Sequence, residues 1–217
     1  MSGYVPLNER PQGGHARLLE LTLADGGPLD VLDVGCSSGY LAAPLAAAGA
    51  RVVGIELDPA AAEEARAYCA EVLVGDVEAM ELPFDPASFD AIVCGDLVEH
   101  LRDPGSTLAR LRPLLRPGGR LVLTTPNVAN WAMRLSLLAG RWRYTERGIL
   151  DRTHTHLFTR KTLAETVDAA GYRILELDHT TPVPLVGTPA VERAAHAVAR
   201  LRPSLLAYQF VLAATPR

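Results

Sequence analysis

The sequence predicts an α/β fold in which helices cover both faces of a parallel sheet. Two observations carry this prediction. Short apolar segments alternate with helical patterns along the first 125 residues, as in chains of β-α-β units. One of these segments, 31–34, runs directly into a turn bounded by Gly35 and Gly39. The length of 217 residues fits one domain with a full core, so residues 1–217 are interpreted as a single domain.

The first half of the chain has clear boundaries between elements. A helix over 14–24 ends at the Asp25–Pro28 break, and the first strand follows at 29–34. Asp58 is a good N-cap and Pro59 suits the first helical turn, which places the start of a further helix there. The other elements expected in this half are helices at 39–48 and about 106–115, and strands at 51–56, 72–74, 89–94 and 120–125.

Beyond Pro126 the pattern changes. Residues 128–140 look helical, and 141–160 are irregular and carry aromatic residues and histidines. The remaining elements expected are a helix at 161–171, a strand at 172–177, a proline-interrupted insertion at 182–189, a helix at 190–201 and a last strand at 206–213.

Charge and composition disfavour several classes of partner. The formal net charge is -4, from 21 basic and 25 acidic residues, and no basic stripe would hold a nucleic acid. The densest positive patch is interpreted as a solvated face, although anionic substrate groups stay open as its ligands; it comprises Arg134, Arg141, Arg143 and Arg147.

The cysteines and the apolar segments predict a compartment. Cys36, Cys69 and Cys94 are an odd number without CxxC spacing, which is typical of reduced thiols in a cytoplasmic protein. Residues 1–14 have no apolar region of a signal peptide, and every apolar stretch is interrupted before 18 residues. We therefore expect a cytoplasmic protein without a membrane span.

The turn and the next strand predict the class of ligand. A strand that stops at a glycine-bounded turn offers backbone N–H groups and room for close approach. The second strand ends at Glu56, whose carboxylate can accept hydrogen bonds from both hydroxyls of a ribose. Together these features indicate a nucleoside-containing ligand.

Five segments then resemble class I S-adenosylmethionine-dependent methyltransferases. The similarity is to the small-molecule branch that includes the ubiquinone-biosynthesis O-methyltransferases, and it covers residues 29–125 closely. Each segment alone is weak, but five in the right order and spacing are specific. They are LDVGCSSG at 32–39, VVGIELD at 52–58, GDVEAMELPF at 75–84, FDAIVCGDLVEHL at 89–101 and LRPGGRLVLTTPN at 115–127.

The resemblance implies a Rossmann-like seven-stranded sheet of order 3-2-1-4-5-7-6 with strand 7 antiparallel, and S-adenosylmethionine as cofactor. It also implies roles for individual residues. Asp33 lies near the methionine amino group, Glu56 holds the ribose, and Asp76 accepts from the adenine amine. The other cofactor-binding positions implied are Gly35 and Gly39 in the turn, Leu57 after the acid, Val77 beside the adenine and Gly95 along the methionine.

One position departs from the family pattern. Ser37 stands where the family has the middle glycine of the turn, and serine tolerates such a turn less freely. We expect a variation that still binds the cofactor. A dinucleotide site is a distant alternative, because its G-x-G-x-x-G pattern is met only by Gly35 and Gly39.

The acceptor chemistry points to histidines. Transfer from a sulfonium requires alignment of the acceptor, and a hydroxyl acceptor also requires a general base. His100 follows the fourth strand, and His154 and His156 alternate, so on an extended segment both would face one way. Hydrogen bonds from these rings to the backbone are the competing structural interpretation. Asp151 and the H-x-H pair could suggest a metal, but no further ligand has suitable spacing, so none is expected.

Residues 127–160 are interpreted as an acceptor pocket or lid, because they mix aromatic and polar side chains. The alternative is that Trp131 and Leu135 are the apolar face of a covering helix. The function expected is methyl transfer to a small molecule, preferably at a hydroxyl oxygen, in secondary or cell-envelope metabolism. The alternative from another class is a non-catalytic, cofactor-binding partner of another enzyme. A monomer or homodimer is expected.

Overall fold

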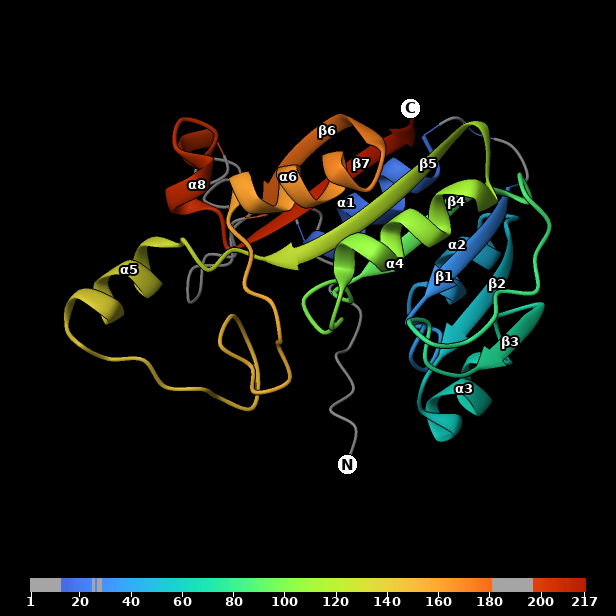
Figure 1. Ribbon diagram of the computed structural model, residues 1–217, viewed down its shortest axis with the longest axis horizontal. Helices are drawn as coiled ribbons and strands as arrows, with labels where there is room; N and C mark the ends of the chain where they lie inside the picture. The colour runs from blue at the N-terminus through green and yellow to red at the C-terminus, as the bar shows by residue number, and fades with distance from the viewer. Residues whose placement is uncertain (1–12, 25, 27–28, 181–196) are drawn as a thin grey trace.

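The computed structural model describes residues 13–24, 26, 29–180 and 197–217, and a seven-stranded sheet runs through them (Figure 1). Its order is β3-β2-β1-β4-β5-β7-β6, and β7 pairs antiparallel with both β5 and β6. The predicted order and the antiparallel strand are confirmed. The strands are β1 (Asp30–Val34), β2 (Arg51–Glu56), β3 (Glu71–Val74), β4 (Phe89–Gly95), β5 (Leu115–Pro126), β6 (Tyr172–Thr180) and β7 (Gln209–Pro216).

Helices cover both faces of this sheet, as predicted. On one face lie α4 (Pro104–Leu111) and α6 (Arg160–Ala169), and on the other α1 (Gly14–Thr22) and α2 (Ala42–Ala47) (Figure 1). Successive side chains of a strand point to opposite faces. Leu32 of β1 therefore packs into the α4–α6 core and its neighbour Val31 into the α1–α2 core. The core is divided by the sheet into two layers.

One helix start follows the expected local chemistry, and another does not. Asp58 accepts a hydrogen bond from the Ala60 N–H at 2.9 Å and caps α3 (Pro59–Ala65), as predicted. The helix expected at 39–48 is shorter, because α2 begins at Ala42. Ser37 and Gly39 have φ angles of 48° and 84°, which a right-handed helix cannot contain, so the turn extends further along the chain.

Other boundaries shift for reasons visible in the chain. The helix expected to reach residue 115 ends at Leu111 and continues as the short 3₁₀ helix η1 (Arg112–Leu114), which contains Pro113. The last strand begins at Gln209, three residues later than expected, because α8 (Pro203–Leu206) precedes it. The insertion predicted at 182–189 and most of the helix predicted at 190–201 lie outside the described residues.

The helix after β5 stands apart from the sheet. α5 (Trp131–Leu138) has no buried residue, and Trp131 and Leu135 are 51% and 57% exposed. Figure 1 shows it beyond the end of β5, followed by a long irregular segment. The interpretation of Trp131 and Leu135 as the apolar face of a covering helix is therefore wrong for this structure. Among the described residues, no helix is long and apolar enough to cross a membrane.

Candidate active site

Asp33 is the most unusual side chain at the carboxyl edge of the sheet. It is fully buried in β1, and neither carboxylate oxygen has a hydrogen-bond partner among the described residues. Burial, together with the charge of Glu56, raises the pKa of Asp33 to about 7. A buried carboxylate without a partner is costly unless a ligand supplies one. A cationic amino group, such as that of a bound methionine, fits this position.

The turn after β1 is held in a shape that favours glycine. Gly35 and Gly39 have positive φ angles of 73° and 84°. A Cβ on Gly39 would lie 3.1 Å from the Cα of Ala65, so the turn approaches α3 too closely for a larger residue. Ser37 also has a positive φ, which explains why the family prefers glycine there, and serine occupies the position in this chain. The predicted variation is thus accommodated by the fold.

Glu56 ties the end of β2 to the turn. Its Oε2 accepts from the Ser37 N–H at 2.8 Å, and its Oε1 accepts from the Asp58 N–H at 2.9 Å. Each oxygen keeps a second lone pair for a hydroxyl donor. Leu57, the next residue, is exposed and offers an apolar surface beside this carboxylate. The Glu56 carboxylate suits the hydroxyls of a ribose, and the Leu57 side chain suits the base attached to it.

Asp76 lies at the end of β3, where an adenine amine is expected. Its Oδ1 accepts from the Glu78 N–H, and its Oδ2 forms an ion pair with Arg102 at 2.5 Å. Val77 is buried against the core next to it. Arg102 also pairs with Glu78, so this guanidinium holds the two acids of the segment in place. Sequence reasoning did not identify Arg102.

Gly95 and Asp96 end β4 beside the same turn. A Cβ on Gly95 would lie 2.5 Å from a methyl of Leu41, so that side chain would have to move to admit a larger residue. Asp96 has a positive φ of 50°, and its carboxylate accepts hydrogen bonds from Thr124 and Gln209. Burial opposes ionisation of Asp96, but hydrogen bonds from His15, Thr124 and Gln209 hold its pKa below the usual value.

The segment that carries the predicted histidines is fastened to the loop after β4. The N–H groups of Thr155 and His156 both donate to the Glu99 carbonyl, at 2.8 and 3.0 Å. The Thr155 hydroxyl donates to the Leu101 carbonyl at 2.6 Å. Phe158 is buried in the core a few residues further on. Two segments more than 50 residues apart are thereby held side by side.

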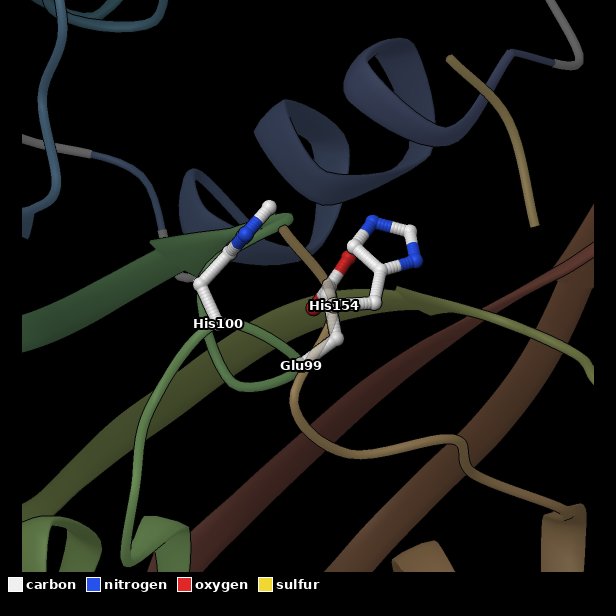
Figure 2. Close-up of side chains that lie close together, drawn as sticks. All are labelled: Glu99, His100 and His154. Carbon is white, nitrogen blue, oxygen red and sulfur yellow. The ribbon is translucent and has the colours of Figure 1, made fainter. Parts of the chain in front are cut away.

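This contact brings His100 and His154 together (Figure 2). Their ring centroids are 4.8 Å apart with an edge-to-face tilt of 72°. The Nδ1 of His100 bonds to the Thr153 carbonyl at 3.2 Å, and that of His154 to the Ile149 carbonyl at 3.0 Å. A carbonyl only accepts, so in each neutral ring Nδ1 carries the proton and Nε2 keeps its lone pair. Partial desolvation of the ring, with the neighbouring His154, lowers the pKa of His100, although the residue is exposed on one side.

His156 is directed elsewhere. Its Nδ1 bonds to the Leu101 carbonyl at 2.9 Å, and its ring stacks on Phe158 at a centroid distance of 6.2 Å. The expectation that His154 and His156 face one way assumed an extended segment, and the chain instead turns and bends within 152–155. Backbone anchoring through Nδ1 is common to all three rings, and His156 differs in lying outside the group of Glu99, His100 and His154.

Glu99 completes the group around the two rings, and sequence reasoning missed it. Its side chain is 1% exposed, and neither carboxylate oxygen has a hydrogen-bond partner among the described residues. Burial and the charge of Asp96 raise the pKa of Glu99 well above its usual value. The only signal in the sequence was its place beside His100 after a strand.

A pocket of about 640 Å³ adjoins His154 through Ile149, whose carbonyl accepts from the His154 ring. Its lining combines apolar residues with cations; it is lined by Met133, Ser136, Arg141, Arg143, Thr145, Arg147, Gly148, Ile149, Leu150 and Tyr208. The three arginines are exposed, and none forms an ion pair with another described residue. They belong to the positive patch interpreted from the sequence as a solvated face.

Comparison with known proteins agrees with this geometry. Residues 7–177 match the methyltransferase domain family, and the chain belongs to it. A ubiquinone biosynthesis O-methyltransferase of Xylella fastidiosa is 37% identical over 131 residues, 58% of this chain and 52% of that protein. One from Acinetobacter baylyi is 28% identical over 155 residues, 68% of this chain and 64% of that protein. The chain spans about half the length of the first curated relatives it matches.

Solved structures share the fold at low identity. An S-adenosylmethionine-dependent methyltransferase from Mesorhizobium loti has a TM-score of 0.63 and 18% identity, over 94% of this chain and 98% of that one. The [4+2]-cyclase SpnF has a TM-score of 0.65 and 22% identity, over 100% of this chain and 85% of that one. A chain from the complex between the Haloferax volcanii Trm112 methyltransferase activator and a methyltransferase has a TM-score of 0.64 and 22% identity. The match covers 93% of this chain and 90% of that one.

S-adenosylmethionine is the cofactor that the family assignment and the site both support. The buried, unpartnered Asp33 carboxylate and the glycine turn fit this molecule. Asp33, Glu56 and Asp76 are the side chains that would hold its amino, ribose and adenine groups.

Proposed function

We propose that the protein transfers a methyl group from S-adenosylmethionine to a hydroxyl oxygen of a small molecule. The observation that carries this proposal is the juxtaposition of two histidines with free Nε2 atoms at the end of β4. β4 is the parallel neighbour of β1, which carries Asp33 near its carboxyl end, so both groups belong to the same edge of the sheet. Bound S-adenosylmethionine supplies a methyl group already activated by the sulfonium charge.

The chain's own residues then have two tasks. Asp33 and Glu56 orient the cofactor, and the His100–His154 pair is the deprotonation centre where the acceptor hydroxyl loses its proton. Of the three candidate histidines, His100 and His154 are proposed for this centre. His156 is proposed as an anchor of the segment, because its ring bonds to the Leu101 carbonyl.

The pocket beside His154 supports a finer proposal for the acceptor. Its volume suits a small molecule, and its apolar wall suits a ring or short chain. Arg141, Arg143 and Arg147 have no acidic partner among the described residues, so an anionic group on the acceptor would supply one. We propose an acceptor with an apolar body and a carboxylate, phosphate or sulfate group.

A second candidate is a cofactor-binding partner of another enzyme. The fold is similar to that of a structure from a Trm112 activator complex and to that of the [4+2]-cyclase SpnF. Because one fold can serve different functions, these likenesses support retaining the second candidate. The monomeric or homodimeric state and the cytoplasmic location stay predictions.

The proposal is tested by incubating the protein with methyl-labelled S-adenosylmethionine and a panel of phenols that do or do not carry an anionic group. Label is expected in the anionic phenols, and Asp33→Asn is expected to abolish the transfer. Cofactor binding without transfer to any phenol or to a small-molecule extract would favour the second candidate.

A further inference from the structure

We propose that Glu99, His100 and His154 form a binding site for a divalent transition-metal ion of the Zn²⁺ type. The inference deepens the proposed function, because it assigns the means by which the deprotonation centre works. It rests on the placement of three ligand atoms (Figure 2) and on the hydrogen bonds that orient the two histidine rings.

The three ligand atoms are close enough to share one ion. One carboxylate oxygen and one ring nitrogen from each histidine all lie within 4.8 Å of one another. Zinc binds nitrogen and carboxylate oxygen at about 2.0–2.2 Å, so two ligands of one ion lie roughly 3–4 Å apart. Shifts of about 1 Å in these side chains therefore complete the first coordination shell.

The histidines are already arranged as metal ligands commonly are. A ligating histidine usually donates its other ring N–H to a carbonyl or carboxylate, which fixes the tautomer. Here both Nδ1 atoms bond to backbone carbonyls, of Thr153 and Ile149, which leaves both Nε2 lone pairs free. The His156 ring has a similar bond to the Leu101 carbonyl, but His156 is not one of the three residues whose ligand atoms lie together.

Glu99 supplies an independent reason to expect a cation. A carboxylate that is 1% exposed, with the Thr125 hydroxyl beside it and no cationic partner among the described residues, is expensive to bury. The Glu99 carbonyl also receives the N–H groups of Thr155 and His156, which holds the two halves of the cluster together. His100 is exposed, so the site is open to ions from solvent.

The ligand set selects the class of ion. Two imidazoles with one carboxylate suit zinc and its neighbours, whereas magnesium and calcium prefer oxygen ligands alone. Three protein ligands leave a position for another oxygen, as in catalytic zinc sites. An acceptor hydroxyl bound there would have a lowered pKa and would release its proton to water. Its oxygen then attacks the methyl carbon, and the carbon–sulfur bond breaks with its electron pair passing to sulfur.

The test uses Co²⁺ as the probe, because its visible absorption reports coordination. The chain, free of any histidine tag and treated with chelator, is titrated with Co²⁺ and then with Zn²⁺ as competitor. One ion per chain is expected, with a new visible band. His154→Ala and Glu99→Gln are each expected to weaken Co²⁺ binding by about 100-fold or more, beyond the loss seen for outer-shell partners.

His156→Ala is the matched control and is expected to keep the Co²⁺ affinity. Thermal unfolding and cofactor binding of each variant show that it is folded. No Co²⁺ uptake by the wild type, or an equal loss in His156→Ala and His154→Ala, would overturn the inference. Because the titration needs no acceptor, its failure with intact methyl transfer would leave the proposed function standing. Metal binding without methyl transfer would support the site and contradict the function.

Discussion

The residues up to Pro126 and the segment 127–160 are built in different ways. In the first region, buried parallel strands place Asp33, Glu56 and Asp76 at their carboxyl ends. In the second, α5 has no buried residue, and the chain is positioned by hydrogen bonds to the loop after β4 and by Phe158. We propose that the first region holds the cofactor and the second the acceptor, and we call them the cofactor frame and the acceptor segment.

The difference teaches where each part of the function is encoded. The cofactor frame follows from local patterns, since each acid lies within two residues of the carboxyl end of its own strand. The acceptor segment depends on contacts between distant residues, such as that between the Glu99 carbonyl and Thr155. Changes in the two regions should therefore affect different measurements.

The largest effect is expected from His154→Ala. His154 is proposed to promote loss of the acceptor proton, either as a base or as a ligand of the proposed ion. Its removal should lower turnover by roughly 10²–10⁴-fold. Initial rates with labelled S-adenosylmethionine and a transferring acceptor measure this. Near wild-type turnover in both His154→Ala and His100→Ala would show that alignment alone drives the reaction.

Phe158→Ala should have the largest effect on stability within the acceptor segment. Phe158 is 4% exposed and packs into the α4–α6 core, so removing its ring should cost about 3–5 kcal/mol of the free energy of unfolding. Urea denaturation followed by circular dichroism measures it. A loss below about 1 kcal/mol would mean that this segment is not anchored through the core.

The contacts that position the acceptor segment could not be predicted from the sequence, whereas much of the fold could. Strand order, the antiparallel strand and the α3 cap were predicted correctly, because they follow from the family pattern and from local chemistry. The role of Glu99 was missed, since the backbone contact that brings His154 beside it spans more than 50 residues. The extended geometry expected for His154 and His156 was wrong, because alternation holds only for an extended chain and this one bends.

Cofactor affinity should depend on pH through Asp33. Its pKa is raised to about 7, so the folded protein without cofactor carries a protonated Asp33 at lower pH. Only the carboxylate attracts the methionine amino group, so affinity should rise as pH increases through 7 and fall about tenfold per unit below it. Calorimetry between pH 5.5 and 8 tests this. The same slope in Asp33→Asn would assign the dependence to another group.

Leu135→Ala in α5 should have the smallest effect. Leu135 is 57% exposed and lies in a helix with no buried residue, so unfolding free energy should change by less than about 0.5 kcal/mol. Thermal and urea unfolding of Leu135→Ala and Phe158→Ala, measured side by side, compare the two losses of unfolding free energy. A loss above about 2 kcal/mol would show that α5 packs against the domain in solution.

The separation of the two regions is tested most directly by calorimetry of S-adenosylhomocysteine, the demethylated cofactor, with three proteins. Glu56→Ala should weaken binding relative to the wild type by about 1–3 kcal/mol, because it removes an ionised hydrogen-bond acceptor. His154→Ala should bind like the wild type, since its ring contacts His100 and the Ile149 carbonyl, outside the cofactor frame. Unchanged affinity in Glu56→Ala, or an equal loss in both variants, would contradict the account.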